Sequence, residues 1–160
     1  MEHEGDFDLD DARIAVVATR WNDVVVDRLV DGALSVLGDC GLDEGSIDVF
    51  RVPGAFELPV VCDRLADGGD YDGIVALGAV IRGETPHFDY ICQETTRGLG
   101  AVALEYGLPV GFGLITADTV EQADARSQPD DESNKGVEAA SAVAEVISLL
   151  RQIEDDSGDS

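Results

Sequence analysis

The sequence predicts an α/β protein, a three-layer α/β/α sandwich around a four-stranded parallel sheet. Two observations carry this prediction. Four short apolar runs, typical of strands buried on both faces, alternate with segments in which apolar residues recur at helical spacing. Such alternation, joined by right-handed crossovers, places helices on both faces of a parallel sheet. A chain of 160 residues suits one domain over 1–160, with acidic tails expected at 1–12 and 154–160.

The expected elements follow one another without a linker or repeat. In chain order they are a strand at 14–19, a helix from Asn22 to Gly41, a strand at 47–52, a short helix within 56–66, a strand at 74–81, a helix from Thr85 to about 106, a strand at 110–116, a short helix at 119–126 and a long helix at 134–153. Asn22 is a favourable helix cap, and Gly41 and Gly68-Gly69 are typical helix ends. Pro86 fits the first position of the helix that follows the third strand.

The composition excludes several classes of function. Asp and Glu number 34 against 10 Lys and Arg, which gives a net charge of −24 and disfavours binding to nucleic acid or acidic lipid. The only lysine is Lys135, and this bias indicates adaptation to a high-salt cytoplasm, with ordinary solubility as the plainer alternative. No run is long enough to span a membrane and no signal peptide is evident, so a soluble cytoplasmic protein is expected. The three cysteines fit buried apolar positions rather than a metal site.

Functional residue types gather where the four expected strands end. The first strand is followed by Arg20-Trp21-Asn22, the second by the segment 53–57, and the third by the segment 82–90, while the fourth contains Phe112. The carboxyl ends of parallel strands meet at one edge of a sheet, which is where ligands bind. The aromatic rings indicate a flat small molecule.

The segment that follows the third strand, RGETPHFDY, suggests an anion pocket beside a proton-transfer group. Thr85 and Pro86 start a helix whose N-terminus carries free N–H groups and partial positive charge. The same positive end disfavours imidazolium, so His87 is expected to be neutral and able to relay a proton. A helix start that merely contains histidine is the alternative. The spacing of Gly78 and Gly83 resembles a phosphate-binding loop, but that loop requires the lysine that is absent here.

Two of the scarce cations flank one loop. Arg126 ends the short helix and Lys135 begins the long one, with the acidic residues Asp130, Asp131 and Glu132 between them. Either this pair holds an anionic group or the segment is an ordinary helix cap with a surface lysine. The local sequence leaves both interpretations open.

Together these segments resemble the lumazine synthase family. The matching segments, in the family's order, are RWN (20–22), PGAFELP (53–59), ALGAVIRGETPHFDYIC (76–92), FGLIT (112–116), EQADAR (121–126) and NKGVEAA (134–140). Trp21 occupies a position that phenylalanine often holds. The resemblance implies a flavodoxin-like fold with strand order 2-1-3-4 and a cofactor-free transferase of riboflavin biosynthesis. It condenses 5-amino-6-(D-ribitylamino)uracil with 3,4-dihydroxy-2-butanone 4-phosphate, giving 6,7-dimethyl-8-ribityllumazine, phosphate and water.

The resemblance also implies roles for particular residues. His87 matches the proton-transfer residue. The residues that match the pyrimidine and ribityl subsite are Trp21, Ala55, Phe56, Glu57, Ala79, Val80, Ile81 and Phe112. Those that match the butanone phosphate subsite are Glu84, Thr85, Arg126 and Lys135. The family forms homopentamers, and in some members a decamer or a shell of sixty subunits, in which a neighbouring subunit contributes Phe112 and Arg126.

Two other functions are alternatives to this one. An archaeal type of riboflavin synthase is a distant relative, and the intact GAFE and RGETPHFDY segments argue against it. A flavodoxin-like module that binds lumazine or flavin without turnover would leave His87 and Arg126 unexplained.

Overall fold

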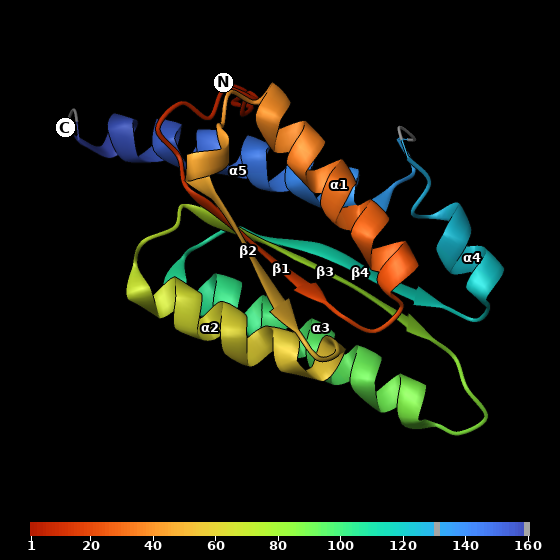
Figure 1. Ribbon diagram of the computed structural model, residues 1–160. Helices are drawn as coiled ribbons and strands as arrows, with labels where there is room; N and C mark the ends of the chain where they lie inside the picture. Colours follow the sequence, from red (N-terminus) through yellow and green to blue (C-terminus); the bar gives the residue numbers. More distant parts are fainter. Residues whose placement is uncertain (130–131, 159–160) are drawn as a thin grey trace.

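The computed structural model describes residues 1–129 and 132–158, and its centre is one parallel sheet (Figure 1). The strands are β1 (Ile14–Thr19), β2 (Ile47–Val52), β3 (Gly73–Ile81) and β4 (Val110–Ala117). They lie in the order β2-β1-β3-β4, and every pairing is parallel. The predicted fold class and strand order are therefore confirmed.

Helices cover both faces of the sheet, as Figure 1 shows. On one face lie α1 (Asp23–Asp39), α4 (Val120–Ala125) and α5 (Lys135–Gly158). On the other lie α2 (Leu58–Gly68) and α3 (His87–Tyr106). Two 3₁₀ turns, η1 (Glu44–Ser46) and η2 (Ala55–Glu57), precede β2 and α2. Alternating side chains of β1 enter the two apolar layers: Ile14, Val16 and Ala18 face α1 and α5, whereas Ala15 and Val17 face α2 and α3.

The contact between α1 and α5 depends on the absence of a side chain at Gly136. A Cβ atom there would lie 2.0 Å from the carbonyl oxygen of Leu29 in α1, so any larger residue would push the helices apart. The neighbouring Asn134 is fully buried and caps α5, because its Oδ1 accepts hydrogen bonds from the amides of Gly136 (2.8 Å) and Val137 (3.1 Å). Its Nδ2 donates to the carbonyl of Gln128 at 3.1 Å. The predicted helix start at NKG is confirmed.

The N-terminal segment, expected as an acidic tail, packs against the α1 and α5 side of the molecule. Leu9 is fully buried, and its amide donates to the carbonyl of Cys40 at 3.0 Å. The amide of Asp6 donates to Ser148 Oγ in α5 at 3.0 Å. Farther along α5, Gln152 Nε2 donates to the carbonyl of Glu4 at 3.1 Å. Residues 4–9 are therefore part of the folded domain.

The C-terminal helix is longer than the sequence indicated. It was expected to end near Ile153, but α5 continues to Gly158, and Ser157 Oγ donates to the carbonyl of Ile153 at 2.9 Å. Within 1–129 and 132–158, no helix combines the length and the apolar character that crossing a membrane requires.

Candidate active site

The carboxyl ends of β1, β2 and β3 and the start of α3 enclose a cavity of about 510 Å³. The residues that line it are Trp21, Asn22, Pro53, Gly54, Ala55, Phe56, Glu57, Ala79, Val80, Ile81, His87 and Ile91. Segments far apart in the sequence are thus brought to one edge of the sheet, as expected for a parallel sheet. Most of these residues were predicted as site residues from the sequence. Asn22, Pro53 and Gly54 were placed at the strand ends without a binding role, and Ile91 was not placed there.

Trp21 and Glu57 both lie close to Gly54 in the lining of the cavity. A Cβ atom at Gly54 would lie 3.4 Å from both Trp21 Cδ1 and Glu57 Oε2, which is ordinary van der Waals contact, so the ring and the carboxylate approach the same point of the chain. Trp21 is 73% exposed and Phe56 is 60% exposed. Large apolar side chains left this open beside a cavity are typical of a surface that a ligand or a partner covers.

Asn22 has a different role from the helix cap predicted for it. It precedes α1 in the left-handed conformation (φ 60°, ψ 48°), and its side chain makes no capping hydrogen bond. Its Nδ2 instead donates to the backbone carbonyl of Ala79 in β3, at 3.0 Å. Asparagine tolerates the left-handed region better than most residues and carries the amide that reaches β3, and both properties explain its presence here.

His87 is the first residue of α3 and its exposed side chain lines the cavity. The His87 amide donates to Thr85 Oγ1 at 3.4 Å, but Thr85 is not the helix cap that was predicted, because α3 has no side-chain capping bond. The helix begins one residue later than predicted, because Pro86 occupies the capping position and its carbonyl accepts from the Asp89 amide at 3.0 Å. Residues 83–87 are all exposed beside the mouth of the cavity.

The remaining predicted site residues do not line this cavity within one chain. Glu84 and Thr85 belong to the exposed loop before His87, and Phe112 lies on the edge strand β4 with 48% of its surface exposed. Arg126 follows α4 and donates from Nη1 to the carbonyl of Gln122 at 2.9 Å. Lys135 pairs with Glu138 at 3.0 Å. The fourth strand end, expected to join the other three, is thus absent from the lining.

Arg126 and Lys135 are nevertheless neighbours, as their positions around one loop suggested. The Lys135 amide donates to the Arg126 carbonyl at 2.9 Å, which closes the loop between α4 and α5. Asp130 and Asp131, the acidic residues noted between these cations, lie outside the described residues. Of the three acidic residues noted there, Glu132 is the one that the structure describes, and its side chain is exposed.

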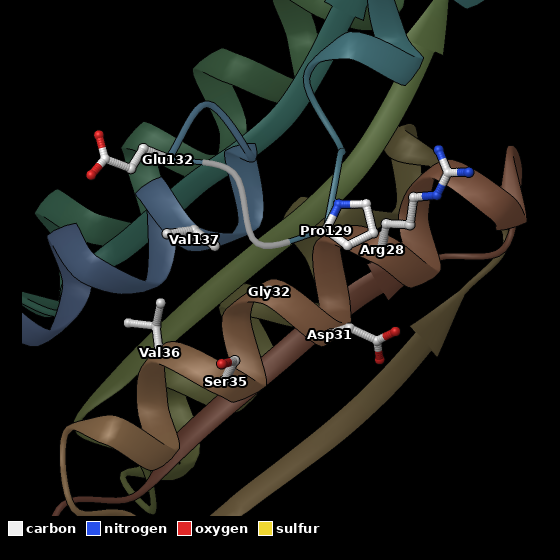
Figure 2. A pocket seen from close by; sticks show the side chains of 8 residues that line it. All are labelled: Arg28, Asp31, Gly32, Ser35, Val36, Pro129, Glu132 and Val137. Carbon is white, nitrogen blue, oxygen red and sulfur yellow. The ribbon is translucent and has the colours of Figure 1, made fainter.

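A second cavity, of about 320 Å³, lies between α1 and the segment that enters α5 (Figure 2). It is lined by Arg28, Asp31, Gly32, Ser35, Val36, Pro129, Glu132 and Val137. Among these described residues none is aromatic or histidine, and the guanidinium of Arg28 is paired with Asp124. The carboxylates of Asp31 and Glu132 disfavour an anionic ligand. The cavity at the strand ends is therefore the better candidate site.

The cysteines supply no reactive thiolate. Burial raises the pKa of Cys62 from 9.0 to about 12, and burial also raises the pKa of Cys40 and of Cys92. In the described part of the chain, no cluster of three or more His, Cys, Asp or Glu side chains could hold a metal ion.

Comparison with known proteins identifies the family of this chain. Residues 11–151 match the family described as 6,7-dimethyl-8-ribityllumazine synthase. A 6,7-dimethyl-8-ribityllumazine synthase of Desulfovibrio desulfuricans is 53% identical over 149 residues, which cover 93% of this chain and 95% of that protein. One of Nitratidesulfovibrio vulgaris (strain Miyazaki F) is 50% identical over 150 residues, covering 94% of this chain and 96% of that protein. The chain belongs to the 6,7-dimethyl-8-ribityllumazine synthase family.

Proposed function

We propose that this chain is a transferase of riboflavin biosynthesis. It condenses 5-amino-6-(D-ribitylamino)uracil with 3,4-dihydroxy-2-butanone 4-phosphate and releases 6,7-dimethyl-8-ribityllumazine, phosphate and water. The observation that carries this function is the single cavity in which an exposed indole, a carboxylate and an imidazole meet, namely those of Trp21, Glu57 and His87. The family membership supplies the identity of the two substrates.

The pyrimidine substrate occupies the strand-end cavity. Trp21 stacks on its ring and Glu57 accepts hydrogen bonds from the ribityl hydroxyls, since an ionised carboxylate is an acceptor only. Ala55, Phe56 and the residues Ala79 to Ile81 line the ring pocket mainly through their backbone. Backbone donors and acceptors on strands and a 3₁₀ turn are held rigidly, which favours one orientation of the ring.

The butanone phosphate binds beside it, at the start of α3. Glu84 and Thr85 lie in the loop before the helix, and the positive end of the helix attracts the phosphate. The primary amine of the pyrimidine forms an imine with the carbonyl of the butanone, with loss of water. Loss of the C3 proton and elimination of phosphate then leave an enol, which tautomerises to a new carbonyl at C3. The ring closes by attack of the ribityl-bearing nitrogen on this carbonyl, and a second water leaves.

His87 transfers protons during these steps, because it is the titratable side chain that lines the cavity from the phosphate side. The substrates provide the carbonyl, the amine and the leaving group, so the protein contributes proximity and proton transfer without a cofactor or a metal.

Complete sites require at least one further copy of the chain. We assign Phe112, Arg126 and Lys135 of a neighbouring subunit to the open side of the cavity, where Phe112 contacts the pyrimidine and the cations hold phosphate. The exposed rings support this arrangement, because Trp21 and Phe56 are largely exposed beside the cavity, and Phe112 exposes about half of its surface on β4, away from that cavity. The expected assembly is a homopentamer, alone or as the unit of a decamer or a larger shell.

The acidic composition reflects a cytoplasm rich in salt. With 34 Asp and Glu against 10 Lys and Arg, self-repulsion weakens when salt shortens the Debye length from about 10 Å at 0.1 M to about 3 Å at 1 M. Three free thiols agree with a reducing compartment. Sedimentation and urea unfolding in about 0.1 M and about 1 M KCl test this, and equal stability and assembly in both would contradict it.

A two-substrate assay tests the function directly. Purified protein is mixed with both substrates, and the lumazine is followed by absorbance while phosphate is measured in parallel. Formation of the two products in equal amounts is the expected result. Binding of the pyrimidine without product would indicate a binding module, and consumption of lumazine itself would indicate a riboflavin synthase.

A further inference from the structure

Arg82 stands in the middle of the site segment, yet none of the roles above uses it. It directly follows β3, and its amide donates to the carbonyl of Ala117 at the end of β4, at 2.8 Å. Its Nε donates to Asp118 Oδ1 at 2.7 Å, and its Nη1 donates to Asp89 Oδ1 at 3.4 Å. Its Cζ lies 4.5 Å from the centroid of the Phe88 ring.

These contacts fasten both ends of the loop that precedes His87. The backbone of Arg82 fixes the start of the loop against β4, and its guanidinium holds Phe88 and Asp89 in the first turn of α3. Between these points, residues 83–87 are all exposed. The carboxylate of Asp118 is itself anchored, because the Asp118 amide donates to Gln122 Oε1 in α4 at 2.8 Å.

We propose that Arg82 is a positioning residue that holds the 83–87 loop and thereby sets the location of His87 and Thr85 relative to the cavity. This role rests on the proposed function, in which His87 moves protons and Thr85 adjoins the phosphate. Arginine suits it because a planar guanidinium can bond two carboxylates and stack on a ring at the same time. Lysine carries the charge but lacks the planar fork.

A direct role in holding the substrate phosphate is the competing interpretation. It is disfavoured because Asp118 and Asp89 already occupy the guanidinium and offset its charge, while Phe88 occupies one face. The two interpretations differ for Asp118→Asn. If Arg82 binds phosphate, loss of the Asp118 carboxylate should free the guanidinium and tighten phosphate binding. If Arg82 positions the loop, the same substitution should loosen the 83–87 loop.

The test uses Arg82→Met, Arg82→Lys and Asp118→Asn, with Arg13→Met as the matched control. Arg13 has the same kind of contacts, with Nη2 at 3.1 Å from Asp48 and Cζ at 5.3 Å from the Tyr71 ring centroid. Arg13 directly precedes β1, so it lies at the amino ends of the strands, whereas the cavity lies at their carboxyl ends. The Arg82 side chain is 46% exposed, so its replacement leaves no buried charge and the variants should fold.

Two measurements are made on each variant: steady-state kinetics with both substrates, and hydrogen exchange of the amides in the 83–89 segment. For Arg82→Met we expect kcat to fall on the order of a hundredfold while the KM for the pyrimidine changes less than about twofold. Exchange in the segment should rise at least about tenfold. Asp118→Asn should also lower kcat and raise the exchange rate of the segment. Arg82→Lys should restore neither kcat nor the exchange rate fully. Arg13→Met should leave both at the values of the unmodified protein.

Three results would overturn the proposal. One is a kcat and an exchange profile of Arg82→Met that match those of Arg13→Met. Another is an Arg82→Lys variant whose kcat and exchange rate equal those of the unmodified protein. The third is a loss confined to the KM for the butanone phosphate, together with a lower value of that KM in Asp118→Asn. Absence of turnover in the unmodified protein would refute the proposed function instead, and the exchange measurement would still decide whether Arg82 holds the loop.

Discussion

The side chain of Asn22 donates a hydrogen bond from Nδ2 to the backbone carbonyl of Ala79, at 3.0 Å, across 57 positions of sequence. This bond joins the turn that carries Trp21 to β3, whose last residues line the cavity. The turn also depends on the residue type at this position, because Asn22 has a left-handed backbone, which most residues other than glycine disfavour. Trp21 and the β3 residues that line the cavity are therefore linked through one side-chain amide.

Replacement of Asn22 should separate the two contributions of this residue. Asn22→Ala loses the hydrogen bond and strains the backbone, so we expect a loss of about 2 kcal/mol in the free energy of unfolding and a higher KM for the pyrimidine. Asn22→Gly accepts the left-handed conformation and should lose only about 1 kcal/mol while showing a similar rise in KM. Urea unfolding and kinetics measure these effects, and equal stability of the two variants would contradict this account.

His87→Ala should slow catalysis without harming the fold. The side chain is exposed, so no core contact is lost, and removal of a general acid or base lowers kcat by about 10²- to 10⁴-fold. Circular dichroism and sedimentation should match those of the unmodified protein. Unchanged turnover would remove His87 from the mechanism.

Arg126→Ala should affect one substrate selectively. If Arg126 holds phosphate, the KM for the butanone phosphate should rise about tenfold or more, whereas the KM for the pyrimidine should change little. Arg64→Ala, which removes another exposed arginine from α2, is the control and should change neither. A comparable increase for both substrates would refute the assignment.

Gly136→Ala should be strongly destabilising. The new Cβ would stand 2.0 Å from the Leu29 carbonyl oxygen, so α1 and α5 must separate, at a cost of about 3 kcal/mol or more. Gly38→Ala is the matched control, because nothing lies within 4 Å of a Cβ there and alanine favours a helix by up to about 1 kcal/mol. Chemical denaturation of both variants tests the contrast, and similar stabilities would show that the helices adjust.

Alkaline conditions should weaken the fold partly through Cys62. Burial raises its pKa in the folded protein from 9.0 to about 12, so the unfolded chain releases this proton first. The stabilisation is complete below pH 9.0 and is lost as the pH rises towards about 12. Cys62→Ala should therefore show a shallower decline of unfolding free energy over this range. An identical slope would mean that the thiol does not contribute.

The architecture could be predicted well from the sequence, because each strand and most helices keep one pattern of apolar residues over their whole length. β1 is apolar at every position except its last, and its six residues are all buried between two helical layers. The end of α5 was misjudged, because the acidic residues after Ile153 have no apolar period. Contacts with the N-terminal segment, such as that from Gln152 to Glu4, support this helix and cannot be seen in either segment alone.

The candidate site was predicted in part for a similar reason. Residues next to strand ends, such as Trp21 and Glu57, follow from the topology of a parallel sheet. The role of Asn22 could not be predicted, because its partner is a backbone carbonyl and every residue has one. The side-chain contacts of Arg82 were missed since they depend on the relative positions of β4 and α3. Phe112 and Arg126 lie outside the cavity of a single chain, and their proposed role depends on a neighbouring subunit.

The packed N-terminal segment has a practical consequence for anyone who produces this protein. Met1 is fully exposed, so a purification tag can be joined ahead of it without disturbing a contact. Trimming the chain to its first strand would instead strip Leu9 from the hydrophobic layer and the Asp6 amide from Ser148. An expression clone shortened to begin at Ile14 should therefore yield a less soluble, more protease-sensitive product than a clone that keeps residues 1–13.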